Sequence, residues 1–184
     1  MSAALELEQT YTADDLLAFP GEFRYELVRG RLREMPPTGG PHGETTSQAS
    51  CRIAVFVQDE SIGRCYAAET GFQIARKPDT VLAPDFAFIA KERVLSPLPE
   101  GYVPVVPDLV IETRSPSQTG ASARAKIDEW LAAGVRMALD IDPGRRRLTV
   151  FRPGRLPLAL EIKDTFDGED VLPGFALRVS RIFE

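Results

Sequence analysis

Short apolar runs separated by turn-forming residues dominate the chain and predict a protein built on β-strands. The run at 108–112 (DLVIE) is wholly apolar between two acids, which is typical of a central strand buried on both faces. Two further runs flank Arg29-Gly30, a sequence that favours a hairpin turn. In all, we expect strands at 25–28, 31–35, 64–69, 72–75, 84–89, 108–112, 137–141, 148–151 and 158–162.

Three segments show the features of helices, at 13–19, about 43–60, and 121–133. Thr12, with Asp15 three residues later, resembles a capping box, and Gly134 stands where a helix commonly ends. The segments 36–41 (PPTGGP) and 91–104 are expected to be loops, and turns are expected at 142–144 and 167–168. This order predicts an α/β fold, a mixed sheet flanked by helices, in a single domain over 10–184 after a loose tail at 1–9.

Composition narrows the class of protein. Hydrophobic residues make up 43% and charged residues 27% of the 184 positions, the balance of a soluble globular protein. No apolar run approaches the roughly 20 residues needed to cross a bilayer, and the acidic N-terminus does not resemble a signal peptide, so we expect a cytoplasmic protein without membrane contact. Cys51 and Cys65, with His42 as the single histidine, cannot form a zinc site or a disulfide framework. Any metal would therefore bind to oxygen ligands.

Charge is unevenly distributed along the chain. The formal net charge is -5, with 22 basic and 27 acidic residues, which argues against a protein that coats nucleic acid. Five arginines nevertheless occur between 145 and 155 without an intervening acid: Arg145, Arg146, Arg147, Arg152 and Arg155. This strip is either a set of contacts to backbone phosphates or a solvated hairpin, and the sequence leaves both readings open.

The signatures of several enzyme classes are missing. The chain has no phosphate-binding loop ending in GK[ST], no GxGxxG and no GxSxG elbow. A serine hydrolase would depend on His42, and no motif places a serine beside it. What remains is a set of carboxylates and one lysine.

Asp85 opens a predicted strand, Glu112 closes a buried one, and Lys126 lies on the following helix. Two acids at adjacent strand ends are suited to hold Mg²⁺, and a nearby lysine would orient water or offset charge on phosphorus. Structural roles explain the same residues: a strand-start aspartate, a rim glutamate, and a lysine that flanks the buried face of its helix.

Taken together, these segments resemble the Uma2 family, a branch of the PD-(D/E)XK nuclease superfamily. The family's opening helix is resembled by TYTADDLLAFP, and its hairpin by YELVRGRLREMPP. The histidine that begins the family's next helix is matched in PHGETTSQAS. The PD of the family lies in APDFAFIA, and its Glu-x-x-Ser-Pro-Ser block is resembled by PDLVIETRSPS. The family's lysine helix is resembled by KIDEWLAAGV, and its C-terminal block by LPGFALRVSRIFE. The resemblance extends from about residue 11 to the end of the chain.

The resemblance implies a restriction-endonuclease-like fold with extra β-hairpins. It implies metal-ligand roles for Asp85 and Glu112, a catalytic role for Lys126, and a place near the site for Glu26 and His42. It further implies Mg²⁺ (or Mn²⁺) as cofactor and DNA as substrate. Together with the short apolar block at the C-terminus, it suggests a homodimer.

Three departures from the family pattern bear on activity. Ser122 stands where an aspartate one turn before the lysine is usual, and Arg136-Met137 replaces the typical aromatic pair. Arg114 follows Glu112 by two, so in a strand it would share the face of Glu112 and could hold a phosphate or a carboxylate.

The sequence therefore predicts a Mg²⁺-dependent DNA endonuclease that uses a water nucleophile. Two alternatives stay open: a catalytically silent nuclease-like module that binds DNA or another partner, and a hydrolase of small phosphoesters.

Overall fold

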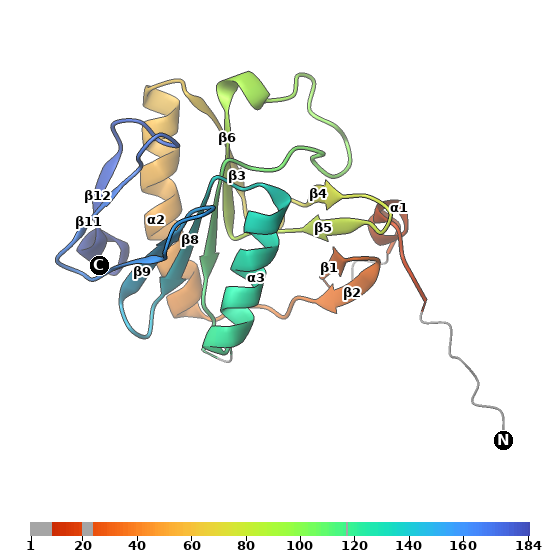
Figure 1. Cartoon of the computed structure of the whole chain (residues 1–184), viewed down its shortest axis with the longest axis horizontal. Helices are drawn as coiled ribbons and strands as arrows, with labels where there is room; N and C mark the ends of the chain where they lie inside the picture. Colours follow the sequence, from red (N-terminus) through yellow and green to blue (C-terminus); the bar gives the residue numbers. More distant parts are fainter. Residues whose placement is uncertain (1–8, 20–23, 117) are drawn as a thin grey trace.

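The computed structural model describes residues 9–19, 24–116 and 118–184. Its centre is a six-stranded sheet in the order β10-β9-β8-β7-β6-β3 (Figure 1). Strands β7 and β8 are parallel, and the other neighbouring pairs of this sheet are antiparallel. The strands are β3 (Gly63–Ala67), β6 (Phe86–Ala90), β7 (Leu109–Thr113), β8 (Met137–Asp142), β9 (Arg147–Phe151) and β10 (Leu158–Leu160).

Two smaller sheets accompany the central one. A four-stranded sheet has the order β2-β1-β5-β4, and β11 pairs with β12. Figure 1 shows them on opposite sides of the molecule. Their strands are β1 (Tyr25–Val28), β2 (Arg31–Glu34), β4 (Phe72–Ala75), β5 (Thr80–Leu82), β11 (Thr165–Asp167) and β12 (Ala176–Arg178).

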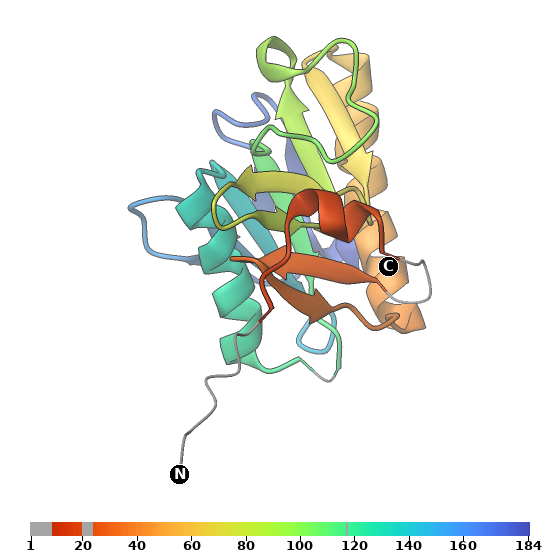
Figure 2. The same cartoon turned by 90° about the vertical axis from the view of Figure 1, so that its right-hand side faces the viewer.

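Helices α2 (Gly40–Asp59) and α3 (Gly120–Ala133) cover opposite faces of the central sheet (Figure 2). Alternation along β7 explains both contacts, because Leu109 and Ile111 pack in the cluster beneath α2 while Val110 packs with α3. The remaining helices are α1 (Ala13–Leu17) and two short 3₁₀ helices, Lys91–Arg93 and Val179–Ile182. Thr12 forms the expected capping box with Asp15, and Gly134 ends α3 in the left-handed conformation.

Several boundaries differ from the sequence prediction. Helix α2 begins at Gly40, inside the segment expected to be a loop, because the fixed backbone angle of Pro41 suits the first turn of a helix. The sequence analysis did not predict β5, β11 or β12, each of which has three residues. Runs this short carry too little periodicity to recognise. Strand β6 also starts at Phe86, so Asp85 lies just before it.

The apolar C-terminal block is part of the monomer's own core. Phe175, Leu177, Val179 and Ile182 are buried in the cluster that includes α2. These side chains are therefore unavailable to a second copy, and the homodimer stays a prediction that rests on the family resemblance. The predicted tail lies almost entirely outside the described residues. None of the described helices is long and apolar enough to cross a membrane.

Candidate active site

Asp85 is held at the end of two central strands. Its backbone N–H donates to the Ile111 carbonyl (3.1 Å), and its Oδ2 accepts a hydrogen bond from the Thr113 N–H (2.7 Å). The β6–β7 register ends at Phe86 opposite Ile111, and Asp85 and Glu112 are the next residues at this end of the two strands. The sequence expectation that these acids lie at neighbouring strand ends therefore agrees with the backbone geometry.

Glu112 points to the α3 face of the sheet and is nearly buried. Its Oε2 lies 2.9 Å from Lys126 Nζ, and its Oε1 accepts a hydrogen bond of 2.7 Å from the indole Nε1 of Trp130. Lys126 and Trp130 are one turn apart on α3, so they reach the same carboxylate from the same helix face. Lysine and tryptophan together thus fix the orientation of Glu112.

Glu26, on β1, is the second carboxylate in contact with Lys126. Its Oε1 lies 3.2 Å from Lys126 Nζ and accepts a hydrogen bond from the Ala83 N–H, while its Oε2 accepts two from the Arg33 guanidinium. Arg33 also donates two hydrogen bonds to Glu129 of α3. Glu26 is only 1% exposed, so a buried negative charge here is balanced by two cations.

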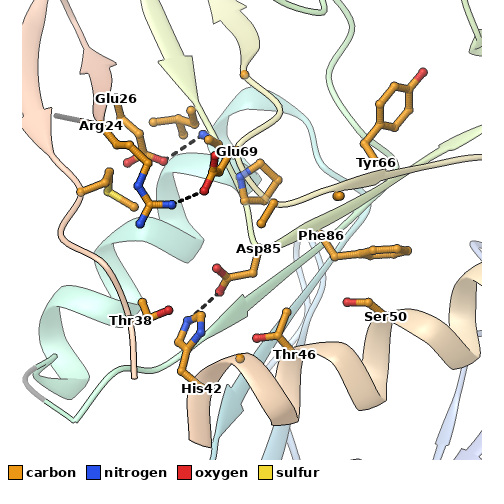
Figure 3. A pocket seen from close by; sticks show the side chains of 18 of the residues that line it. Arg24, Glu26, Thr38, His42, Thr46, Ser50, Tyr66, Glu69, Asp85 and Phe86 are labelled. Atoms are coloured by element: carbon orange, nitrogen blue, oxygen red, sulfur yellow. Dashed lines mark hydrogen bonds and ion pairs between the residues drawn. The ribbon is translucent and has the colours of Figure 1, made fainter. Parts of the chain in front are cut away.

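His42 approaches Asp85 from the opposite side of the sheet. It lies in the first turn of α2, is 7% exposed, and its Nε2 is 3.2 Å from Asp85 Oδ2 (Figure 3). Thr46, one turn later, donates to the Thr113 hydroxyl and so ties α2 to the same strand end. The helix thus positions the imidazole against the Asp85 carboxylate.

The charges of this cluster shift one another's protonation equilibria. Burial, together with the charges of Asp85 and Glu26, raises the pKa of Glu112 above its ordinary value, although Lys126 opposes the shift. Burial alone would lower the pKa of Lys126, but Glu112 and Glu26 outweigh it and raise that pKa. Lys126 therefore stands in the cluster as a cation.

The structure thus brings together the five residues that the sequence analysis selected: Glu26, His42, Asp85, Glu112 and Lys126. The sequence analysis missed three partners. Arg33 and Trp130 bind the carboxylates of Glu26 and Glu112, and Thr113 binds that of Asp85. Only the position of Trp130, four residues after Lys126, hinted at its role.

The carboxylates fit a hard divalent cation in their chemistry. Asp85 and Glu112 supply the oxygen donors that Mg²⁺ prefers, and this ion needs few protein ligands because it retains several waters. Both contacts of Asp85 given above use Oδ2, which leaves Oδ1 for a ligand. Among the described residues, however, no group of three or more histidine, cysteine, aspartate or glutamate side chains is arranged to hold a metal.

The arginines expected to contact DNA differ in their surroundings. Arg114 donates to Asp140 and lies 3.3 Å from Asp142, so these carboxylates already hold its guanidinium. Arg147 pairs with Glu161, and Arg145 lies 4.0 Å from Asp142. Within the described part of the chain, no ion pair forms at Arg146.

Ion pairs also hold Arg152 and Arg155, the last two arginines of the strip. Arg152 pairs with Glu169 and Asp170, and Arg155 pairs with Glu169. Protein carboxylates therefore already bind much of the strip's positive charge.

A cavity of about 840 Å³ opens beside the cluster. Glu26, His42 and Asp85 line one end of it, between α2 and the four-stranded sheet. The Asp85 carboxylate and the His42 imidazole therefore face a ligand that enters the cavity, whereas Glu112 and Lys126 are not among its lining residues.

Comparisons with known proteins identify the family and the fold of the chain. The Uma2 family model, described as "Putative restriction endonuclease", matches residues 10–180. A crystal structure described as "a putative nuclease belonging to DUF820 from Anabaena variabilis ATCC 29413" is similar with a TM-score of 0.79 and 24% identity, over 94% of this chain and 97% of that one. This likeness confirms the predicted α/β fold. No curated protein sequence matches the chain.

Proposed function

Since the chain belongs to the Uma2 family of restriction endonuclease-like proteins, we propose that it is a Mg²⁺- or Mn²⁺-dependent nuclease that hydrolyses phosphodiester bonds in DNA. One observation carries the proposal: Asp85, Glu112 and Lys126 come from two strands and a helix to one end of the central sheet. Carboxylates beside a lysine at strand ends are suited to phosphoryl transfer, which depends on positioning and charge.

Asp85 and Glu112 would hold the cation. When bound, Mg²⁺ would polarise a phosphoryl oxygen and lower the pKa of an attacking water. Water would add to phosphorus in line with the P–O bond that breaks, losing one proton to solvent, and the departing oxygen would take up one proton from solvent and leave as an alcohol. Lys126, kept charged by two carboxylates, would donate hydrogen bonds to the attacking water or to a phosphate oxygen.

The surrounding residues would act by orienting these groups. His42 and the Thr113 N–H hold the Asp85 carboxylate from two sides. Trp130 holds Glu112, and Glu26 holds the Lys126 ammonium group. Such fixed partners keep reacting groups in place without reorganisation during the reaction.

The test is DNA cleavage by the unmutated protein and two isosteric variants. Asp85→Asn and Glu112→Gln should each abolish Mg²⁺- or Mn²⁺-dependent cleavage and weaken cation binding measured by calorimetry. Asp128→Asn is the matched control, because this exposed acid lies on α3 and, among the described residues, its ion pair is the local one with Arg124. Cation binding and cleavage that persist in both site variants would overturn the proposal.

One observation favours a second function, DNA binding without cleavage. Both carboxylate oxygens of Glu112 already contact protein donors, and a cation would compete with Lys126 for one of them. If the unmutated protein binds DNA but cleaves no substrate with either metal, the silent module is the better interpretation.

A further inference from the structure

The cavity is much larger than the charged end that the proposed reaction would use. Its volume is about 840 Å³, and from Asp85 it extends along α2 toward Ser50 and Phe86 (Figure 3). A phosphate with its cation would occupy only the end near His42 and Asp85. The remainder of the cavity therefore needs its own explanation.

Short side chains on one face of α2 leave this space open. Thr46, Ser50 and Ala54 follow His42 at intervals of four residues, so they form one stripe along the helix, and all of them line the cavity. Aromatic rings also line the cavity, where Phe19 and Tyr25 contact each other edge to face at 5.7 Å. A slot lined by small residues and aromatic rings suits a flat ligand.

An unsatisfied polar atom lies on the stripe. Among the described residues the Ser50 hydroxyl oxygen is buried and has no hydrogen-bond partner. A buried hydroxyl without a partner is unfavourable, and rotation of the Ser50 side chain to another rotamer would let it bond to the polar edge of a ligand. Figure 3 shows the Ser50 side chain on the cavity side of α2.

The charge of the lining argues against a polyanion inside the cavity. Among the described lining residues Arg24 is the single lysine or arginine, and it forms an ion pair with Glu69. Backbone phosphates require several cations along their path, and the cavity does not supply them. A neutral ring with hydrogen-bonding edges fits this lining, whereas a chain of phosphates does not.

We propose that this part of the cavity binds one unstacked nucleobase next to the phosphate that is cleaved, and that the substrate is single-stranded DNA. Assigning the ligand to DNA rests on the proposed function. A paired base must first be flipped out of the duplex, at the cost of unpairing and unstacking it, whereas bases of a single strand can splay out and stack on aromatic side chains.

The experiment measures binding without cleavage. A fluorescein-labelled oligonucleotide, single-stranded or annealed to its complement, is titrated in EDTA and followed by fluorescence anisotropy. Single-stranded DNA should bind at least about tenfold more tightly than the duplex. Ser50→Trp, which fills the slot, should lower single-strand affinity by about tenfold or more, the loss expected when one stacked base is expelled.

Two further variants keep the test decisive. Ser47→Trp narrows the same cavity from an exposed position and replaces Ser50→Trp if that variant does not fold. Val55→Trp is the matched control, because Val55 is on the same helix, is 57% exposed and does not line the cavity. It should change affinity by less than about twofold.

Equal or tighter binding of duplex, or folded cavity variants that bind single strands normally, would overturn the proposal. Tighter binding of single-stranded RNA of the same sequence would overturn its assignment to DNA. If the protein cleaves duplex DNA with a metal and Ser47→Trp does not change this cleavage, the nucleobase slot is rejected and the proposed nuclease function stands. If the protein binds single strands selectively but cleaves no DNA, the slot stands and the nuclease function is rejected.

Discussion

Arg114 and Lys126 both follow Glu112 in the chain but have different partners. Arg114 extends the β7–β8 ladder, because its N–H donates to the Ile141 carbonyl, and its guanidinium binds Asp140, which is 2% exposed and pairs with Glu112 in register. Lys126 instead contacts Glu112 and Glu26 directly. The structure therefore assigns Arg114 to holding the sheet together and leaves Lys126 as the cation beside Glu112.

Substituting the two cations should separate these roles. Lys126→Ala should lower single-turnover DNA cleavage by about 10²–10³-fold, because it removes a positioned donor from the reacting phosphate. Arg114→Ala should leave cleavage within about tenfold but lower the free energy of unfolding by about 1–3 kcal/mol, since it leaves buried Asp140 without its partner. Urea unfolding checks the second value. An inactive Arg114→Ala with an active Lys126→Ala would contradict both assignments.

At the scale of elements, one arginine connects the β1–β2 hairpin to α3. Arg33 on β2 binds Glu26 on β1 and Glu129 on α3, residues that are 7 and 96 positions away in the sequence. Because Glu26 also contacts Lys126, this arginine links the hairpin to the proposed active site. The hairpin is thus part of the site's support.

A double-mutant cycle measures this connection. Arg33→Ala and Glu129→Ala, made singly and together, should show a coupling free energy of about 0.5–1 kcal/mol, because the pair is bidentate but partly exposed. Equilibrium urea unfolding of the four proteins gives the value. Additive effects would mean that the hairpin is held by its apolar contacts alone.

A second connection joins the β11–β12 ribbon to the central sheet. Asp170, in the loop between β11 and β12, receives hydrogen bonds from Arg152 and Arg136. These arginines lower the pKa of Asp170 to about 2. The unfolded chain lacks them, so its Asp170 titrates near the ordinary value.

This shift predicts a pH-dependent stability difference. A carboxyl whose pKa is lower in the folded state stabilises it above the unfolded pKa, and the effect disappears as pH falls through the folded value. Asp170→Asn should therefore be less stable than the unmutated protein at pH 7, by less than about 1 kcal/mol because the side chain is exposed. The difference should decline below about pH 4 and vanish only below about pH 2. Thermal unfolding across this range measures it, and a constant difference would exclude the ion pairs as its cause.

At the scale of the whole molecule, ion pairs decide which basic residues can meet DNA. Arg147, Arg152 and Arg155 are bound to acids, whereas Arg146 is exposed and forms no ion pair among the described residues. The arginine strip is therefore only partly available as a phosphate-binding surface.

The salt dependence of DNA binding tests this distinction. Arg146→Ala should make the plot of log affinity against log salt shallower by about 1, the loss of one phosphate contact. Arg147→Ala should leave the slope unchanged, because Glu161 already neutralises its charge. Equal slopes for all three proteins would assign the strip to the solvated-hairpin interpretation.

The sequence by itself determined the central strands and the residues that carry the proposed chemistry. Three features are local in the sequence and can therefore be predicted from it: the apolar run of β7, the helix cap at Thr12 and the helix end at Gly134. The order of the segments, through the family resemblance, also selected Asp85, Glu112 and Lys126. These features depend on residues that are close together in the sequence or on their spacing.

Only the tertiary structure decided the partners of those residues. Glu26 meets Lys126 across the fold, and Arg33 meets Glu129 over 96 positions, because the four-stranded sheet packs beside α3. The three-residue strands and the cavity between α2 and the four-stranded sheet likewise depend on how distant segments pack. A charge pattern in the sequence does not reveal which acid each arginine will bind, since that choice is made when folding brings distant acids and arginines together.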